Sequence, residues 1–137
     1  MKTTIVLFCL ALLAAAPAPT PEEALRARVK EFTQALLKEN YDVAGRCVNP
    51  DLLDTAGEDK VKEKLRERMT AAKGGAKLYG RKLSSFSIRR VTIEKDKINA
   101  TVVVYYSTGE GGGNANRREF PSQQEWVLKD KIWYWTK

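Results

Sequence analysis

The sequence has 137 residues, which is enough for one domain and too little for two. Hydrophobic residues make up 43% of the chain and aromatic residues 9%, so the chain can bury a core and general disorder is excluded. Because the chain has no histidine, Ser-His-Asp triads and histidine-based acid–base catalysis are excluded, and its net charge of +7 favours an acidic partner.

The first segment has the pattern of a secretory signal. Lys2 supplies a positive charge, and an apolar run from Ile5 to Ala16 ends among small residues. The run is shorter than the roughly 20 residues that a transmembrane helix needs. We therefore expect cleavage among Ala14 to Ala18, export to the periplasm or the medium, and no membrane span in the mature form; the alternative is an uncleaved N-terminal anchor. Residues 1–21 then hold the signal and a short proline-rich segment, and residues 22–137 form a single domain.

The cysteines exclude two further kinds of site. Cys9 lies within the apolar run, so cleavage would leave Cys47 as the one cysteine of the mature chain. A lone thiol cannot form an internal disulfide, and no histidine is present to activate it as a nucleophile. Zinc sites built from cysteine and histidine need more ligands than the chain offers. We expect Cys47 to be buried, with no metal site and no cofactor.

Helical patterns occupy the first half of the expected domain. Thr20-Pro21-Glu22-Glu23 has the residues of an N-terminal capping box, and apolar residues at helical spacing predict a helix from there to about Glu39. Asn49-Pro50-Asp51 predicts a turn that ends a short helical segment. A second long helix is expected from Glu58 to about Ala72, and Gly74-Gly75 is a plausible stop for it.

From Lys77 onward the hydrophobic period changes to two, which predicts strands. The parity of the apolar residues switches at Arg89-Arg90, which predicts a β-bulge in the first strand. We interpret Ser107 to Asn116, which contains four glycines, as a flexible hairpin loop. Pro121 predicts a bulge or an edge position in the third strand, and a fourth strand is expected at Ile132 to Thr136. The predicted fold class is α+β, with N-terminal helices packed on a curved four-stranded antiparallel sheet.

The chain resembles the nuclear transport factor 2-like superfamily from about Ala24 to Lys137. The resemblance rests on the first helix running into Glu39-Asn40-Tyr41-Asp42, on the proline turn Asn49-Pro50-Asp51-Leu52, and on the closing strands Glu125-Trp126-Val127-Leu128 and Lys131-Ile132-Trp133-Tyr134. It implies a cone-shaped, cystatin-like fold with a pocket between helices and sheet, and often a dimer through the outer sheet face. Enzymes of the superfamily, such as ketosteroid isomerase and scytalone dehydratase, place Asp, Tyr or His in that pocket, while many other members, including exported ones, have no known activity.

Aromatic residues are the candidates to line such a pocket, although ordinary core packing would also account for each of them. The candidate cavity residues are Phe32, Tyr106, Trp126, Trp133 and Trp135. Our leading hypothesis is an exported, non-enzymatic binding or interaction domain. Its partner would be a small apolar ligand in the cavity, or another protein or a second copy at the sheet face.

Two alternatives stay open. An enzyme of the isomerase or dehydratase type would need a cavity carboxylate and a tyrosine, and no pattern assigns a carboxylate to the cavity. The available acids are Asp42, Asp51, Asp54, Glu119 and Glu125. A structural or inhibitory envelope protein would instead act through a basic surface. Two basic pairs, Arg89-Arg90 and Arg117-Arg118, lie on strands that we expect to be neighbours and are candidates for contact with an acidic partner; after export, nucleic acid is not expected as a partner.

Overall fold

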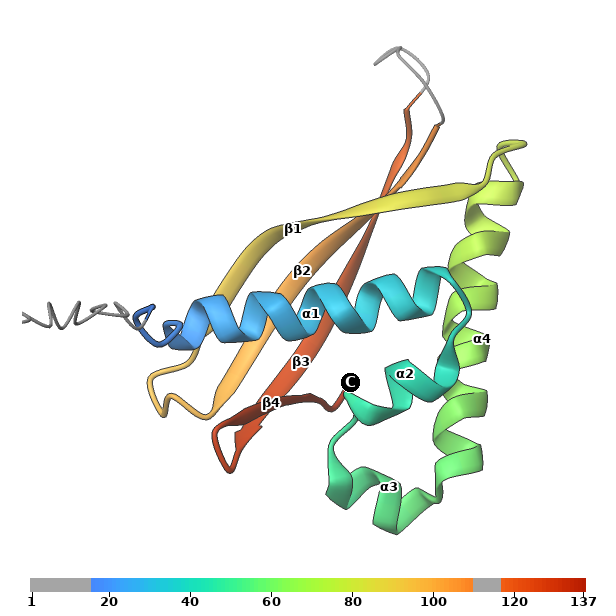
Figure 1. Cartoon of the computed structure of the whole chain (residues 1–137). Helices are drawn as coiled ribbons and strands as arrows, with labels where there is room; N and C mark the ends of the chain where they lie inside the picture. The colour runs from blue at the N-terminus through green and yellow to red at the C-terminus, as the bar shows by residue number, and fades with distance from the viewer. Residues whose placement is uncertain (1–15, 110–116) are drawn as a thin grey trace, which may run out of the picture.

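The computed structural model describes residues 16–109 and 117–137, in which four helices precede a four-stranded antiparallel sheet (Figure 1). The helices are α1 (Pro21–Leu37), α2 (Tyr41–Arg46), α3 (Pro50–Ala56) and α4 (Glu58–Lys77). The strands are β1 (Leu83–Ile93), β2 (Asn99–Thr108), β3 (Glu119–Lys129) and β4 (Ile132–Trp135), in the order β1-β2-β3-β4. The predicted α+β fold is confirmed. Most of the expected signal and most of the glycine-rich loop lie outside the described residues.

One face of the sheet packs against the helices and forms the core. In β2 every second residue from Ala100 to Tyr106 is buried, and α1 crosses this face (Figure 1). In β1 the register shifts between Ile88, which pairs with Val104, and Arg90, which pairs with Val103. The predicted β-bulge is therefore confirmed, and it returns the apolar residues that follow it to the helix side.

Helix α1 begins with the predicted capping box. The Glu23 backbone N–H donates to Thr20 Oγ1 at 3.2 Å, and the Thr20 N–H donates to Glu23 Oε2 at 3.0 Å. The helix ends at Leu37, two residues before the predicted end, because Glu39 adopts a positive φ of 57°. The N–H of Asn40 then donates to the carbonyl of Ala35 at 2.8 Å and closes the helix end.

Of two predicted breaks in the helical half, the one at Asn49-Pro50 is present, since α2 ends at Arg46, whereas the one at Gly74-Gly75 is wrong. After that break Asn49-Pro50 also starts helix α3, which was not predicted, because Asn49 Oδ1 caps the Asp51 N–H at 3.1 Å and proline suits the first helical position. Helix α4 passes through Gly74-Gly75 and ends at Lys77. Glycine inside a helix costs only about 1 kcal/mol relative to alanine, so the packing of the following turn, where Ala76 is fully buried, decides the outcome.

The last strands hold the aromatic residues of the core in place. β4 pairs only with residues 126–129 of β3, so the half of β3 that contains Pro121 has a neighbour on one side alone, and the predicted edge position is confirmed locally. Trp135 is tied to the helical half by two backbone hydrogen bonds, from its N–H to the Cys47 carbonyl at 2.7 Å and from the Asn49 N–H to its carbonyl at 2.8 Å.

Among the described residues, no helix has the length and apolarity needed to cross a membrane.

Candidate ligand-binding cavity

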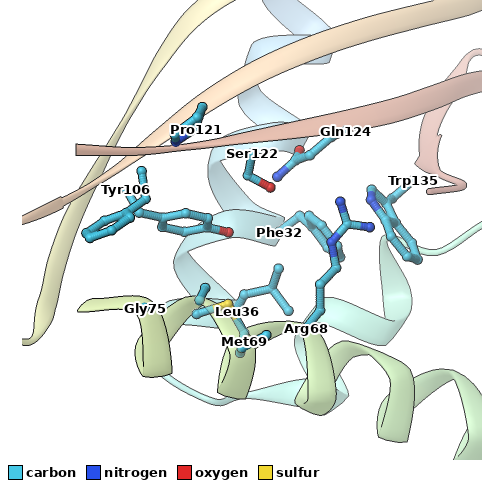
Figure 2. Close-up of a pocket in the computed structure, with 13 residues that line it drawn as sticks. Phe32, Leu36, Arg68, Met69, Gly75, Tyr106, Pro121, Ser122, Gln124 and Trp135 are labelled. Atoms are coloured by element: carbon cyan, nitrogen blue, oxygen red, sulfur yellow. The ribbon is translucent and has the colours of Figure 1, made fainter. Parts of the chain in front are cut away.

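A cavity of about 260 Å³ lies between α1, α4 and the inner face of the sheet (Figure 2). Phe32 and Leu36 come from α1, Met69 from α4, Tyr106 from β2 and Trp135 from β4. The remaining lining residues are Arg68, Ala71, Ala72, Gly75, Phe120, Pro121, Ser122 and Gln124. The walls are thus mainly apolar, with a few polar groups among them, as in most small-molecule sites.

Three of the five predicted cavity residues line this cavity, namely Phe32, Tyr106 and Trp135. Phe32 stacks on Trp135 with ring centroids 5.3 Å apart, and it meets Trp126 edge-on at 5.5 Å. Trp126 is almost fully buried and does not line the cavity. Trp133 is also core, and its indole N–H donates to the carbonyl of Pro21 at 3.2 Å. Trp126 therefore supports Phe32 from behind the cavity wall, whereas Trp133 packs near the start of α1.

Gln124 is a fixed polar group in the cavity wall. Its amide nitrogen donates to Thr33 Oγ1 at 3.2 Å, and its amide oxygen accepts from Trp126 Nε1 at 3.1 Å. All three side chains are buried. Sequence reasoning missed Gln124, although it shares the inward parity of Phe120 and Trp126. A polar residue at an inward position of a strand was the feature that could have identified it.

Arg68 and Tyr106 provide the polar groups for a ligand. The exposed Arg68 donates from Nη2 to the Gln123 carbonyl at 2.9 Å, and its guanidinium carbon lies 5.5 Å from the Trp135 ring centroid. Burial raises the pKa of Tyr106 to about 12, while the positive charge of Arg68 acts in the opposite direction. At neutral pH the cavity lining therefore carries a neutral hydroxyl and a guanidinium cation. Figure 2 shows the Tyr106 hydroxyl and the Arg68 side chain both directed into the space between α4 and the sheet.

No Asp or Glu is among the residues that line this cavity. Of the acids considered for catalysis, Asp42 forms an ion pair with Lys62 at 2.7 Å, and Lys62 holds the pKa of the Asp42 carboxyl below its ordinary value. The other acids that form ion pairs are Glu119 with Arg89, Glu125 with Lys137, and Asp51 with Lys129. Asp54 is exposed on α3.

Cys47 lies outside the cavity lining and is fully buried, as predicted. Burial raises the pKa of its thiol to about 11, so the reactive thiolate is scarce at neutral pH. In the described ranges, 16–109 and 117–137, no group of three or more His, Cys, Asp or Glu side chains is arranged to hold a metal ion.

The structure brings together one arginine of each pair in the predicted basic patch. Arg89 contacts Glu119 and Arg117 contacts Ser107, and these two contacted residues pair directly in the sheet. Strand β2 separates β1 from β3, so the two pairs are not on neighbouring strands. Arg89 lies on the outer face, over the Tyr105 ring at 5.1 Å, and forms an ion pair with Glu119 at 2.5 Å. Arg118 lies over the ring of Tyr79, 4.1 Å from its centroid, beside the end of α4.

The other two arginines lie near the same strands. Arg117 donates to Ser107 Oγ at 3.2 Å, and Arg90 is exposed at the position that pairs with Val103.

The comparisons with known proteins identify the fold. No family model matches the sequence, and no curated protein matches it. Among solved structures, a protein from Campylobacter jejuni, provisionally named an NTF2-like transpeptidase, is 18% identical over 82% of this chain and 97% of that chain, with a TM-score of 0.61. This chain therefore has the nuclear transport factor 2-like fold, as the sequence resemblance predicted. At this identity the likeness concerns the fold alone.

Two further solved structures are less similar. An NTF2-like protein of unknown function from Shewanella oneidensis is 13% identical over 86% of this chain and 100% of that chain, with a TM-score of 0.49. A SEC-C motif containing protein from Rhodopseudomonas palustris is 15% identical over 86% of this chain and 76% of that chain, with a TM-score of 0.48.

Proposed function

We propose that this chain is an exported binding domain that holds a small, mainly apolar molecule with one acidic group in the cavity between α1, α4 and the sheet. The observation that carries the proposal is the combination of apolar walls with two polar groups, the Arg68 guanidinium and the neutral Tyr106 hydroxyl. A carboxylate accepts charge-assisted hydrogen bonds from an arginine, and a neutral hydroxyl adds a second donor. The apolar part of the ligand would pack against Phe32 and Met69.

The size of the cavity limits the ligand. Its volume of about 260 Å³ lies just below the range of roughly 300–1,000 Å³ that is usual for sites of drug-sized ligands. A single aromatic ring or a branched aliphatic chain with a carboxylate suits this space. A steroid or a two-chain lipid is too large for it.

The same lining favours binding over turnover. An isomerase-type mechanism uses a carboxylate to remove a proton and a second group to stabilise the oxyanion. Tyr106 could serve as the second group, but the cavity lining contains no carboxylate to serve as the first. The proposal is therefore a binding domain without catalysis.

Export is part of the proposal and rests on the N-terminal sequence. Lys2 and the apolar run from Ile5 to Ala16 have the pattern of a secretory signal. Cleavage among Ala14 to Ala18 would leave Thr20, which caps α1, in the mature chain. N-terminal sequencing of the protein from the producing cells tests this point, and an intact Met1 would contradict it.

The cavity is tested with phenylacetate as the probe and phenylacetamide as its uncharged analogue of the same shape. We expect isothermal titration calorimetry to show that phenylacetate binds more tightly than phenylacetamide. Arg68→Gln should reduce this preference, because a neutral side chain removes the cation beside the carboxylate.

A pair of glycine variants provides a matched control for the location of the site. Gly75 lines the cavity, whereas a Cβ atom added to Gly74 would have no neighbour within 4 Å. Gly75→Leu should fill the cavity and weaken phenylacetate binding by at least about tenfold, a loss of about 1.4 kcal/mol, whereas Gly74→Leu should leave it unchanged. Equal affinities in the two variants, or no binding of either probe to the parent chain, would contradict the proposal.

A further inference from the structure

The connection between α4 and β1 exposes two large apolar side chains. Leu78 is 87% exposed and Tyr79 is 53% exposed. They follow directly after α4, at the opposite end of that helix from α3, where the chain reaches one extremity of the molecule (Figure 1). Exposed apolar residues that lie side by side require an explanation, whereas a single one does not.

The exposure of these two residues is fixed by the backbone. Gly80 has a positive φ of 67°, which glycine adopts without steric cost. The Arg81 N–H donates to the Ala76 carbonyl at 3.1 Å, and the Gly80 N–H donates to the Lys77 carbonyl at 2.8 Å. This is the Schellman pattern that closes a helix. The turn therefore presents Leu78 and Tyr79 to the solvent in a defined conformation.

Basic side chains surround this apolar tip. Lys77, Arg81 and Lys82 lie within four residues of Leu78 in the sequence, and Lys73 lies about one helical turn earlier. Together with Glu39, Gly80 and Leu83 they line an open depression of about 600 Å³ beside the tip. Glu39, the one acid among these residues, forms an ion pair with Lys73 at 3.1 Å.

Arg118 adds a further cation from the strand side. Its guanidinium carbon lies 4.1 Å from the centroid of the Tyr79 ring. The tip therefore combines an aliphatic side chain, a tyrosine and a group of cations that outnumber the neighbouring acid. Tyrosine is enriched at the interface between membrane and water, where its ring lies at the level of the headgroups.

We propose that the α4–β1 connection docks the protein on an anionic lipid bilayer. Leu78 and the ring of Tyr79 would enter the headgroup region, while Lys77, Arg81, Lys82 and Arg118 would attract the anionic headgroups. Basic residues next to an anionic membrane surface and inserted apolar side chains contribute independently to such binding. The apolar residues form a protruding tip, which suits a fluid bilayer better than the surface of a folded protein. This docking site adjoins the ligand cavity, because the Tyr79 ring lies 6.4 Å from the ring of Phe120 in the cavity wall.

The test uses the full chain with a reporter at the tip, because the N-terminal apolar run could itself bind vesicles. The variant carries Cys9→Ser and Leu78→Cys, and the new thiol is labelled with an environment-sensitive fluorophore while Cys47 stays buried. We expect a blue shift of the fluorescence with vesicles that contain phosphatidylglycerol, and none with vesicles of phosphatidylcholine alone. The matched reporter replaces Ile98, which is 49% exposed in the β1–β2 hairpin, and it should not respond.

Charge reversal tests the role of the basic residues. Lys77→Glu with Lys82→Glu should weaken the response to phosphatidylglycerol vesicles by at least about tenfold in apparent affinity. Lys60→Glu with Lys64→Glu changes the net charge equally, at exposed positions near the start of α4, and should have much less effect. An equal response from the Ile98 reporter, equal effects of the two double variants, or a response to soluble heparin but to no vesicle would overturn the proposal. The last of these results would indicate an acidic macromolecule as the partner instead.

Discussion

At the scale of single residues, Gln124 shows how a polar side chain can be part of the core. It occupies an inward position of β3 and is only 2% exposed. Its amide group satisfies both the Thr33 hydroxyl and the Trp126 indole N–H, and Trp126 in turn packs against Phe32 of the cavity wall. One amide group therefore links α1 to the tryptophan that supports the cavity wall.

Replacing Gln124 should accordingly destabilise the fold. Gln124→Leu would keep the volume but leave the buried Trp126 N–H and the Thr33 hydroxyl without this partner, which should reduce the free energy of unfolding by about 1–3 kcal/mol. Urea unfolding followed by circular dichroism measures the change. Gln123→Leu, at an exposed position one residue earlier, serves as the control and should change the stability by less than about 0.5 kcal/mol. Similar losses in both variants would show that the buried amide has no special role.

At the scale of secondary structure, the end of α4 determines both sites. The helix passes through Gly74-Gly75, so Gly75 reaches the cavity and Leu78 is carried to the surface. Had the helix stopped at Gly74, neither arrangement would exist. The end is instead set by Gly80, which has a positive φ of 67°. A residue with a side chain adopts this backbone conformation only at a cost in free energy.

Alanine substitutions at Gly74 and Gly80 should change the stability of the protein in opposite directions. Gly74→Ala should stabilise the protein by about 0.5–1 kcal/mol, because alanine favours a helix interior and the added Cβ meets no neighbour within 4 Å. Gly80→Ala should destabilise it by about 1 kcal/mol, because the left-handed backbone conformation disfavours a Cβ atom. Thermal unfolding of the two variants measures both changes. A stabilising Gly80→Ala would mean that α4 does not end as described.

At the scale of the whole molecule, the core contains two ionisable side chains, Cys47 and Tyr106, within the described part of the chain. Both are uncharged when protonated, and burial raises the pKa of Cys47 to about 11 and that of Tyr106 to about 12. In the unfolded chain they ionise near their ordinary pKa values of 9.0 and 10.0. Their contribution to stability is therefore complete below about pH 9 and is lost as the pH rises toward 12.

The alkaline loss of stability should depend on Tyr106. Between pH 8 and pH 11 the parent chain should lose about 1 kcal/mol more of its unfolding free energy than Tyr106→Phe, because phenylalanine has no proton to release in the unfolded state. Urea unfolding at the two pH values provides the measurement. Tyr134→Phe, which alters a residue on the outer face of β4, should lose as much stability as the parent. If Tyr106→Phe also lost as much as the parent, the buried hydroxyl would not be the cause.

Local features of the sequence predicted much of the fold. Side-chain chemistry within a few residues determined the capping box at Thr20, the bulge at Arg89-Arg90 and the edge position of Pro121, and the structure confirms all three. The prediction missed the helix that starts at Asn49-Pro50 and was wrong at Gly74-Gly75, where the same residues are compatible with a break or with a helix. Tertiary packing decided between these possibilities, since the local preferences amount to only about 1 kcal/mol.

The cavity was less accessible to sequence reasoning. Phe32, Tyr106 and Trp135 were identified as candidates by residue type and parity, but Trp126 and Trp133 satisfied the same criteria and are core. Arg68 was missed because its place on an exposed part of α4 does not show that it reaches the cavity. That contact depends on the rotation of α4 relative to the sheet, which follows from packing along the whole helix.

The sequence by itself determined the α+β class, the number of strands and the alternation of buried residues along β2 and β3, because hydrophobic period and turn chemistry are local properties. Only the tertiary structure decided where space is left in the core and which side chains meet there. It also placed Arg89 over Tyr105 on the outer face of the sheet, and Arg118 beside the exposed tip at Leu78 and Tyr79. These arrangements depend on contacts between residues far apart in the chain, and such contacts are set by the packing of whole elements.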